Sequence, residues 1–418
     1  MKNSVKQGQD AVDVIVIGGG ASGMMAAGRA AERGRKVLLL EKNPTLGAKL
    51  SITGGGRCNI TNAEPDIRKL LRHYGDAEQF LYSPFSEFGN QHTFDFFTKR
   101  GLPLKVEGGQ RAFPETERAT DVTRVLEKYI TEHKVTIHTN ESVLQIITKG
   151  DLVTGVRTGK NTYTGAAIIL ATGGRSHPET GSTGDGFEWL RILGHEVISS
   201  TPGIVPLVTK EKWAHEMTGV AFPLARVTFF CDNKRSFTKK GKLLFTHFGL
   251  SGPVILNSAS NVGDLLHEGA ITVSIDLFPE EDHHVLETRI LALFDAHKNK
   301  SLKNTLGDII SPGMVSPFLS QFDINEETKV HSVTKETRKQ LMHSLKALTM
   351  TVTGLMGYDR AVVADGGITL REIDTKTMRS ALYKNLFVTG DLLHIHRPSG
   401  GFSLQLCWTT GWVAGNNA

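Results

Sequence analysis

A strand, a glycine-rich turn, a helix and a second strand follow one another near the N-terminus, and this unit limits the possible folds more than any other feature. The β-branched run VDVIVI at 12–17 stops at the glycines of GGGASG. MMAAGRAAERG then predicts a helix ending at Gly34, and KVLLL at 36–40 predicts a second buried strand. Strands joined through a helix in this way are parallel, with a right-handed crossover. We therefore expect an α/β domain with a parallel sheet.

The turn between strand and helix has the spacing of a dinucleotide-binding motif. Gly18, Gly20 and Gly23 fit G-x-G-x-x-G, which permits a tight turn, close approach of a pyrophosphate and close helix packing. The phosphates would lie at the unsatisfied amides of the helix N-terminus. Glu41 ends the second strand, where a carboxylate accepts both ribose hydroxyls and disfavours a 2′-phosphate. A chance glycine turn in an unrelated α/β fold is the alternative, and Glu41 favours the dinucleotide.

Residues 51–63, SITGGGRCNITNA, place three consecutive glycines beside few side chains. Such a stretch adds no core volume and raises the entropic cost of folding, so it suits a place where a ligand lies against the main chain. Because it follows the Glu41 strand, we expect the ribityl chain and isoalloxazine of FAD to lie on it. Arg57 and Asn59 are predicted to contact the pyrophosphate and flavin edges, with Lys49 neutralising charge. A glycine-rich surface loop is the alternative.

Two further segments fit an FAD site. Asp391 closes a strand, where its carboxylate would bind the ribityl hydroxyls, and Gly400–Ser403 begins a helix whose positive end would face the flavin and stabilise its reduced form. Ala171–Gly173 is predicted to pass beneath FAD, with an ordinary turn as the alternative. The predicted cofactor-binding residues are Gly18, Gly20, Ala21, Ser22, Gly23, Glu41, Lys42, Lys49, Thr53, Gly54, Gly55, Gly56, Arg57, Cys58, Asn59, Thr61, Val143, Ala171, Thr172, Gly173, Gly390, Asp391, Gly400, Gly401, Phe402 and Ser403.

Composition excludes several classes of protein. The first residues, MKNSVKQGQDA, lack the apolar region of a signal peptide, and no window is long and apolar enough for a membrane helix, so we expect a cytoplasmic protein that does not bind membranes. The three cysteines are far apart in sequence, which indicates reduced thiols and gives no metal-binding pair. We expect no metal.

A net charge of +5 permits an anionic ligand or a nucleic acid without requiring one.

The remaining pattern indicates three parts. Residues 1–195 and 351–418 are predicted to form a discontinuous FAD-binding domain. Residues 196–279, with short strands and turns, are predicted to form an inserted β-rich domain completed by a strand near 348–360, and residues 280–347 a helical lobe.

Several segments together resemble one family of flavoproteins. GGGASGMMAA, GAKLSITGGGRCNITN, RAFPETERATDV, TGSTGDGFEWLRILGH, TPGIVPL, THFGLSGP and GGFSLQ, spread over nearly the whole chain, are similar to the BaiN-like, aminoacetone-oxidase-like FAD proteins. The resemblance implies a glutathione-reductase-type, Rossmann-like FAD domain interrupted by a β-barrel-like domain and a small helical domain. It also implies redox chemistry, with aminoacetone oxidation, bile-acid reduction and reduction of uridine to dihydrouridine in ribosomal RNA as the reactions connected with the family. The HIHRPS segment at 394–399 departs from the T-G-G-Y-N pattern of many relatives, so the substrate surface there differs.

Hydride transfer at a flavin needs a proton donor or acceptor near the substrate. The candidates are Cys58, His247 and His396, and Arg397 is a candidate for holding a substrate carboxylate or phosphate, with a salt bridge as its alternative. Asp185 is expected to cap the helix that follows it. A second G-x-G-x-x-G is missing, so NADH or NADPH would bind only transiently over the flavin as electron donor; a protein partner or a reductant other than a nicotinamide are the alternatives.

The partner is either a small molecule or RNA. Lys234, Arg235, Lys239, Lys240 and Lys242 crowd one hairpin-like segment, which would contact phosphates if RNA were the substrate and would otherwise be a solvated face. The functional hypotheses are an FAD-dependent oxidoreductase with a small-molecule substrate, a flavin-dependent reductase that modifies RNA, and a flavin-bound scaffold or sensor without turnover. The sequence leaves the oligomeric state open.

Overall fold

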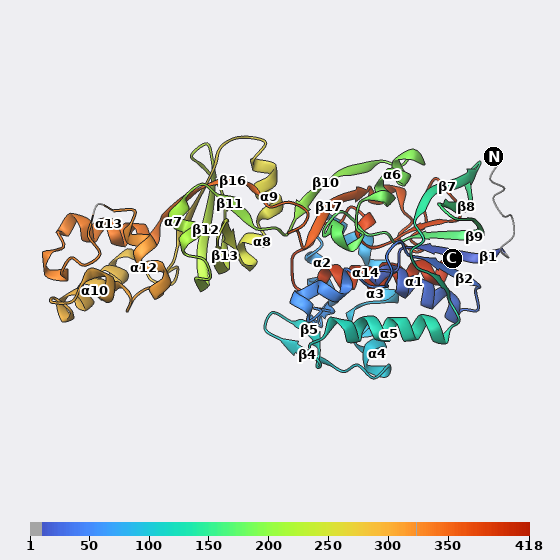
Figure 1. Ribbon diagram of the computed structural model, residues 1–418, viewed down its shortest axis with the longest axis horizontal. Coiled ribbons are helices and arrows are strands. Elements are labelled where there is room, and N and C mark those ends of the chain that lie inside the picture. The colour runs from blue at the N-terminus through green and yellow to red at the C-terminus, as the bar shows by residue number, and fades with distance from the viewer. Residues whose placement is uncertain (1–10, 323) are drawn as a thin grey trace. The chain divides into compact units, whose positions relative to one another are not determined.

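The computed structural model describes residues 11–322 and 324–418, which divide into two compact units (Figure 1). Unit 1 comprises the chain up to Thr201 together with Val362–Ala418, and unit 2 comprises Pro202–Ala361. The three-part division expected from the sequence stays a prediction.

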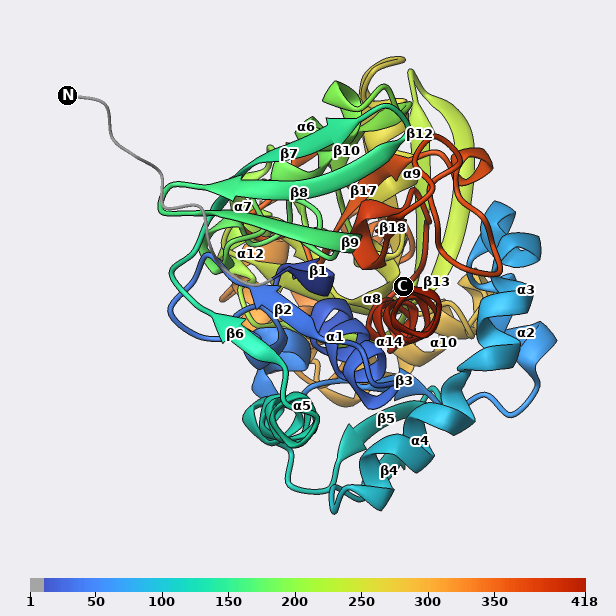
Figure 2. The same ribbon diagram turned by 90° about the vertical axis from the view of Figure 1, so that its right-hand side faces the viewer.

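A seven-stranded sheet forms the centre of unit 1 (Figure 2). β1 pairs in parallel with β2 and with β9, while β7, β8 and β9 form an antiparallel meander. The expected α/β class and its N-terminal βαβ unit are confirmed. The strands are β6 (Thr136–His138), β2 (Val37–Leu40), β1 (Val12–Ile17), β9 (Thr162–Leu170), β8 (Leu152–Thr158) and β7 (Val143–Lys149) in spatial order, with β18 (Leu386–Val388) also paired to β9.

Helix α1 (Ala21–Glu32) lies between α14 (Phe402–Asn417) and α5 (Ala119–Glu132), as Figure 2 shows. Small residues permit this close packing, because a Cβ at Gly411 would lie 2.4 Å from the carbonyl oxygen of Ser22. The C-terminal helix therefore belongs to the same core as the first helix. The other elements of unit 1 are η1 (Leu50–Gly56), β3 (Thr61–Asn62), α2 (Ile67–Arg72), η2 (Gly75–Ala77), α3 (Glu78–Glu87), α4 (Asn90–Lys99), β4 (Leu104–Glu107), β5 (Arg111–Pro114), η3 (Pro178–Thr180), α6 (Asp185–Ile192), η5 (Leu370–Glu372) and η6 (Gly390–Leu392).

The chain leaves unit 1 along β10 (Val197–Gly203) and returns along β17 (Val363–Ile368). These two strands pair with each other as a separate two-stranded sheet.

Unit 2 contains a closed six-stranded barrel, as expected from the family resemblance. Inward side chains such as Val227, Phe229 and Phe245 share one apolar core with Leu286 and Leu345 of the neighbouring helices. The barrel strands are β11 (Leu207–Thr209), β14 (Gly249–Ser251), β13 (Lys234–Thr246), β12 (Ala221–Cys231), β15 (Ile271–Asp276) and β16 (Leu348–Leu355), and the helices are α7 (Lys212–Glu216), α8 (Pro253–Leu256), α9 (Ala259–Leu265), α10 (His283–Ala296), α11 (Leu302–Leu306), α12 (Pro312–Leu319), η4 (Val330–Ser332) and α13 (Lys335–Lys346).

Within the described residues, no helix has the length and apolar character needed to cross a bilayer. The same residues contain no group of three or more His, Cys, Asp or Glu side chains placed to hold a metal ion.

Candidate functional site

Unit 1 contains a cavity of about 520 Å³ at the carboxyl ends of β1, β2 and β9. Ile17, Leu40 and Ala171 line it where these strands end. In open α/β sheets, ligands bind outside the carboxyl ends of the strands, so this is the expected position for a nucleotide.

The three motif glycines make different contacts at one end of this pocket. A Cβ at Gly23 would lie 1.8 Å from the carbonyl oxygen of Gly18, and one at Gly18 would lie 2.5 Å from that of Ala171. These two glycines therefore let α1 and β9 pack closely around the turn. A Cβ at Gly20 would meet no atom within 4 Å, although Gly20 lines the pocket. The open side of Gly20 fits a phosphate group lying against the N-terminus of α1.

Glu41 lies beside this glycine turn and is 93% buried, with 7% of its surface exposed. Its Oε2 accepts the N–H of Gly19 at 2.7 Å, and its Oε1 accepts the N–H of Asn43 at 2.8 Å. Each carboxylate oxygen can accept a further hydrogen bond. The orientation held by the two amides therefore suits a ribose diol.

The three consecutive glycines lie in η1, an irregular 3₁₀ segment. Gly54, Gly55 and Gly56 are exposed and have φ angles of +57°, +68° and +85°, a left-handed conformation that favours glycine. Nothing lies within 4 Å of a Cβ built on Gly55 or Gly56. Gly54 and Gly55 line the pocket, so bare backbone is available there for a flat ligand.

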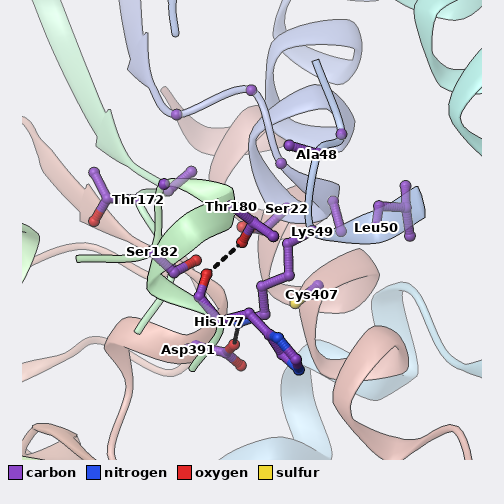
Figure 3. Close-up of a pocket in the computed structure, with 18 of the residues that line it drawn as sticks. Ser22, Ala48, Lys49, Leu50, Thr172, His177, Thr180, Ser182, Asp391 and Cys407 are labelled. Carbon is purple, nitrogen blue, oxygen red and sulfur yellow. Dashed lines mark hydrogen bonds and ion pairs between the residues drawn. The ribbon is translucent and has the colours of Figure 1, made fainter. Parts of the chain in front are cut away.

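A charge cluster of the buried Asp391 and Arg397 with the partly exposed Lys49 lies beside the N-terminus of α14. Lys49 Nζ is 3.1 Å from Asp391 Oδ2 (Figure 3), and the guanidinium of Arg397 forms an ion pair with Oδ1 of the same carboxylate. Burial alone would raise the pKa of Asp391, but the positive charges of Lys49 and Arg397 outweigh it and hold the pKa below its usual value. The cluster carries one net positive charge, which adds to the positive end of α14 and favours an anionic ligand.

Residues 177–183, named here the roof segment, also contribute to the pocket. Asn43 Nδ2 donates to the carbonyl of Thr180 at 2.9 Å, and Lys42 Nζ donates to Thr183 Oγ1 at 2.6 Å and contacts Asp185 at 2.8 Å. These bonds attach the roof segment to the end of β2. Asp185 does not cap α6, contrary to expectation, because its carboxylate binds Lys42 and Thr183 instead.

Most residues predicted to bind the cofactor line this pocket, and their roles stay predictions. Those on the pocket are Gly18, Gly20, Ala21, Ser22, Glu41, Lys42, Lys49, Thr53, Gly54, Gly55, Asn59, Val143, Ala171, Thr172, Gly173, Asp391, Gly400, Gly401 and Ser403. Those not among its lining residues are Gly23, Gly56, Arg57, Cys58, Thr61, Gly390 and Phe402. Pocket residues that the sequence reasoning missed include Asn43, Ala48, Glu141, His177, Thr180, Ser182, Trp189, Val362 and Cys407.

Arg57 makes contacts away from the pocket. Its guanidinium lies 2.5 Å from Glu107 and 2.9 Å from Glu117 and stacks on the ring of Phe113. The pKa of Arg57 is raised, mainly by its hydrogen bond to Glu107 and further by its hydrogen bond to Glu117. The structure therefore shows Arg57 joining η1 to the β4–β5 hairpin and to the turn between β5 and α5.

The candidate proton donors and the candidate anion-binding residue lie in different surroundings. Cys58 is fully buried, and burial raises the pKa of its thiol to about 12, so its role as a proton donor stays a prediction. Arg397 has 1% side-chain exposure and forms the salt bridge that was its alternative role. His396 pairs with Asp365 at 3.2 Å and is not among the lining residues. His247 follows β13 in unit 2, and its role stays a prediction.

Parallel pairing of β1 with β2 and β9, this glycine turn, an acidic residue at the end of β2 and a pocket extending to a C-terminal helix are typical of the class of FAD-binding flavoproteins. The chain matches the HI0933-like protein Rossmann domain over residues 12–417 and belongs to that family. It is an FAD-dependent oxidoreductase.

Two relatives match almost end to end. The 3-dehydro-bile acid delta(4,6)-reductase of Clostridium scindens is 28% identical over 96% of this chain and 98% of its own length. The ribosomal RNA dihydrouridine synthase of Escherichia coli is 28% identical over 96% of each chain. Among solved structures, a 3-ketosteroid-Δ4-(5α)-dehydrogenase from Rhodococcus jostii superposes with a TM-score of 0.54 at 12% identity, covering 99% of this chain and 98% of its own, which shows a shared fold.

Proposed function

We propose that FAD lies in the unit 1 pocket with its adenosine ribose on Glu41 and its pyrophosphate at Gly20 and the N-terminus of α1. Gly54 and Gly55 would then lie against the flavin end, near the Lys49–Asp391 pair. The observation that carries this proposal is the continuity of one cavity from Glu41 to Gly400 and Gly401. Bound FAD supplies hydride transfer to or from a substrate carbon.

We further propose that the reaction is reduction of a carbon–carbon double bond conjugated to a carbonyl, with NADH or NADPH as electron donor. Conversion of uridine to dihydrouridine saturates such a bond, and the bile-acid reductase is named for double bonds next to a 3-oxo group. The positive charge of the Lys49–Asp391–Arg397 cluster supports this direction, because it stabilises negative charge that develops on reduction.

An anaerobic experiment tests this reaction. The purified holoprotein is mixed with NADH or NADPH and the loss of oxidised-flavin absorbance is followed, after which 2-cyclohexen-1-one is added as a small neutral enone. We expect bleaching by one nicotinamide and recovery of the absorbance on adding the enone. Bleaching without recovery would contradict the proposed substrate class, and no bleaching by either nicotinamide would contradict the proposed donor.

RNA as the substrate is a second candidate that one surface favours. Lys234, Arg235, Lys240 and Lys242 of β13 are exposed, whereas Lys239 is half-buried and donates to the carbonyl of Asn257. Exposed cations that contact phosphates make binding salt-dependent. Ribosomal RNA binding that is unchanged by neutralising Lys240 and Lys242 together would count against this candidate.

Replacing Glu41 by alanine should reduce FAD affinity by about tenfold to a hundredfold, because the two hydrogen bonds that the ribose hydroxyls donate to the charged carboxylate are lost. The affinity is measured by titrating apoprotein with FAD. Glu188→Ala, which removes an exposed carboxylate from α6 in the same unit, serves as the matched control. An unchanged affinity in Glu41→Ala would mean that the ribose lies elsewhere.

A further inference from the structure

The roof segment carries a histidine that the sequence reasoning did not use. His177 lines the pocket, with 26% of its side chain exposed, and its Nδ1 lies 2.8 Å from Oε1 of Glu179. No hydrogen bond joins its Nε2 to the described part of the chain. A carboxylate on one ring nitrogen fixes the orientation of an imidazole and leaves the other nitrogen for a ligand.

The other titratable side chains of the pocket are held by partners. Glu41 accepts two backbone amides, Lys42 binds Asp185, and Lys49 binds Asp391, as described above. Glu141 is buried and lies 3.2 Å from Lys160, and burial raises the pKa of Cys407 to about 12. Among these groups, His177 is the one with a ring nitrogen that no hydrogen bond occupies within the described part of the chain, so it is the candidate proton donor.

The backbone of His177 is held in an unusual conformation. Its φ and ψ are 53° and 61°, in the left-handed region that residues other than glycine rarely adopt. The carbonyl of His177 accepts the N–H of Thr180 at 2.9 Å and its hydroxyl at 2.7 Å, the latter drawn in Figure 3. Such conformations persist where the surroundings over-determine them, and they cluster at functional sites.

We propose that His177 is the proton donor to the carbonyl oxygen of the substrate, an inference that rests on the proposed reduction of an enone. Bound FAD would supply a hydride to the β-carbon, and His177 would donate its Nε2 proton to the carbonyl oxygen as the double bond moves to lie between the α-carbon and the carbonyl carbon. The N–H bond breaks as an O–H bond forms. The resulting enol becomes the saturated ketone in water, and the imidazole regains its proton from solvent.

The first test measures ligand binding without turnover. Oxidised holoprotein is titrated with 4-cyanophenol, whose ionised form resembles an enolate, and the change in flavin absorbance gives the dissociation constant. We expect about tenfold weaker binding in His177→Asn, since asparagine tolerates the left-handed backbone but lacks an atom at the Nε2 position. His177→Gln, which retains an N–H donor near that position, should recover part of the affinity. His133→Asn, at the end of α5, is the matched control.

The second test measures proton transfer. Each holoprotein is reduced with dithionite and mixed anaerobically with 2-cyclohexen-1-one, and we expect reoxidation to be about a hundredfold slower in both His177 variants. Because glutamine can donate a hydrogen bond but not a proton at neutral pH, recovered phenol binding with slow reoxidation in His177→Gln is the signature of a donor.

The two tests separate failure of the inference from failure of the proposed function. Phenol binding that is absent, or equal in wild type and His177→Asn, overturns the assignment of His177 whatever the enone does. Loss of FAD from both His177 variants also overturns it, because the histidine would then be a cofactor ligand. If the enone reoxidises no variant while phenol binding depends on His177, the proposed reaction fails and the ligand contact stands.

Discussion

Asp391→Asn should lower the free energy of unfolding by about 3–5 kcal/mol, because it removes the carboxylate from between two cations and leaves Arg397 buried without its counter-charge. Arg397 donates also to the carbonyl of Ile395 and to Ser403, but neither partner carries a charge. The measurement is urea-induced unfolding of the apoprotein. Asp151→Asn, which removes a carboxylate from an exposed pair with Lys384, should change the stability little.

The loss of stability caused by Asp391→Asn should be largest at neutral pH and should decrease in acid. Because the pKa of Asp391 in the folded protein is below its unfolded value of about 3.9, its ionised form stabilises the fold above that value. This contribution is lost as the pH falls through the folded pKa. The difference between wild type and variant should therefore be complete at neutral pH and shrink in acid. A difference that stays constant down to acid unfolding would contradict the ion-pair explanation.

Replacing Gly23 or Gly20 of the dinucleotide-binding motif by alanine should have different effects on stability and on FAD affinity. Gly23→Ala should destabilise the apoprotein by about 1–3 kcal/mol or more, because its Cβ would overlap the backbone oxygen of Gly18 and push α1 away from β1. Gly20→Ala has an ordinary φ of −82° and open space around its Cβ, so the apoprotein should lose less than about 1 kcal/mol. FAD affinity should nevertheless fall by at least about tenfold in Gly20→Ala, because the new methyl group fills the approach of the pyrophosphate.

Urea unfolding and FAD titration of both apoproteins measure this contrast. If Gly20→Ala binds FAD as the wild type does, the pyrophosphate does not approach the helix at this residue. If the two substitutions destabilise the apoprotein equally, the space around the added Cβ does not determine the stability at these positions.

The parts of the site that could be predicted from the sequence come from residues that are close together along the chain. Gly18, Gly20 and Glu41 belong to one strand–turn–helix–strand unit, so periodicity and spacing place them together. Arg57 shows what such reasoning lacks, because its partners Glu107 and Glu117 lie at the end of β4 and in the turn after β5, which the chain reaches only later. The roof segment was missed for the same reason. Its attachment to Lys42 and Asn43 depends on tertiary contacts, and its own sequence, with Gly181 inside it and Gly184 directly after it, is typical of an ordinary turn.

The interruption of unit 1 by unit 2 has a consequence for the timing of biosynthesis. The glycine turn and Glu41 emerge early from the ribosome, but Asp391 and α14, which complete the pocket and pack on α1, emerge only after residues 202–361. At about 5–20 residues per second, translation of that insertion takes roughly 10–30 s. During this interval the nascent first segment exposes the face of α1 that α14 later covers, and the complete cofactor pocket can form only once the last helix has been made.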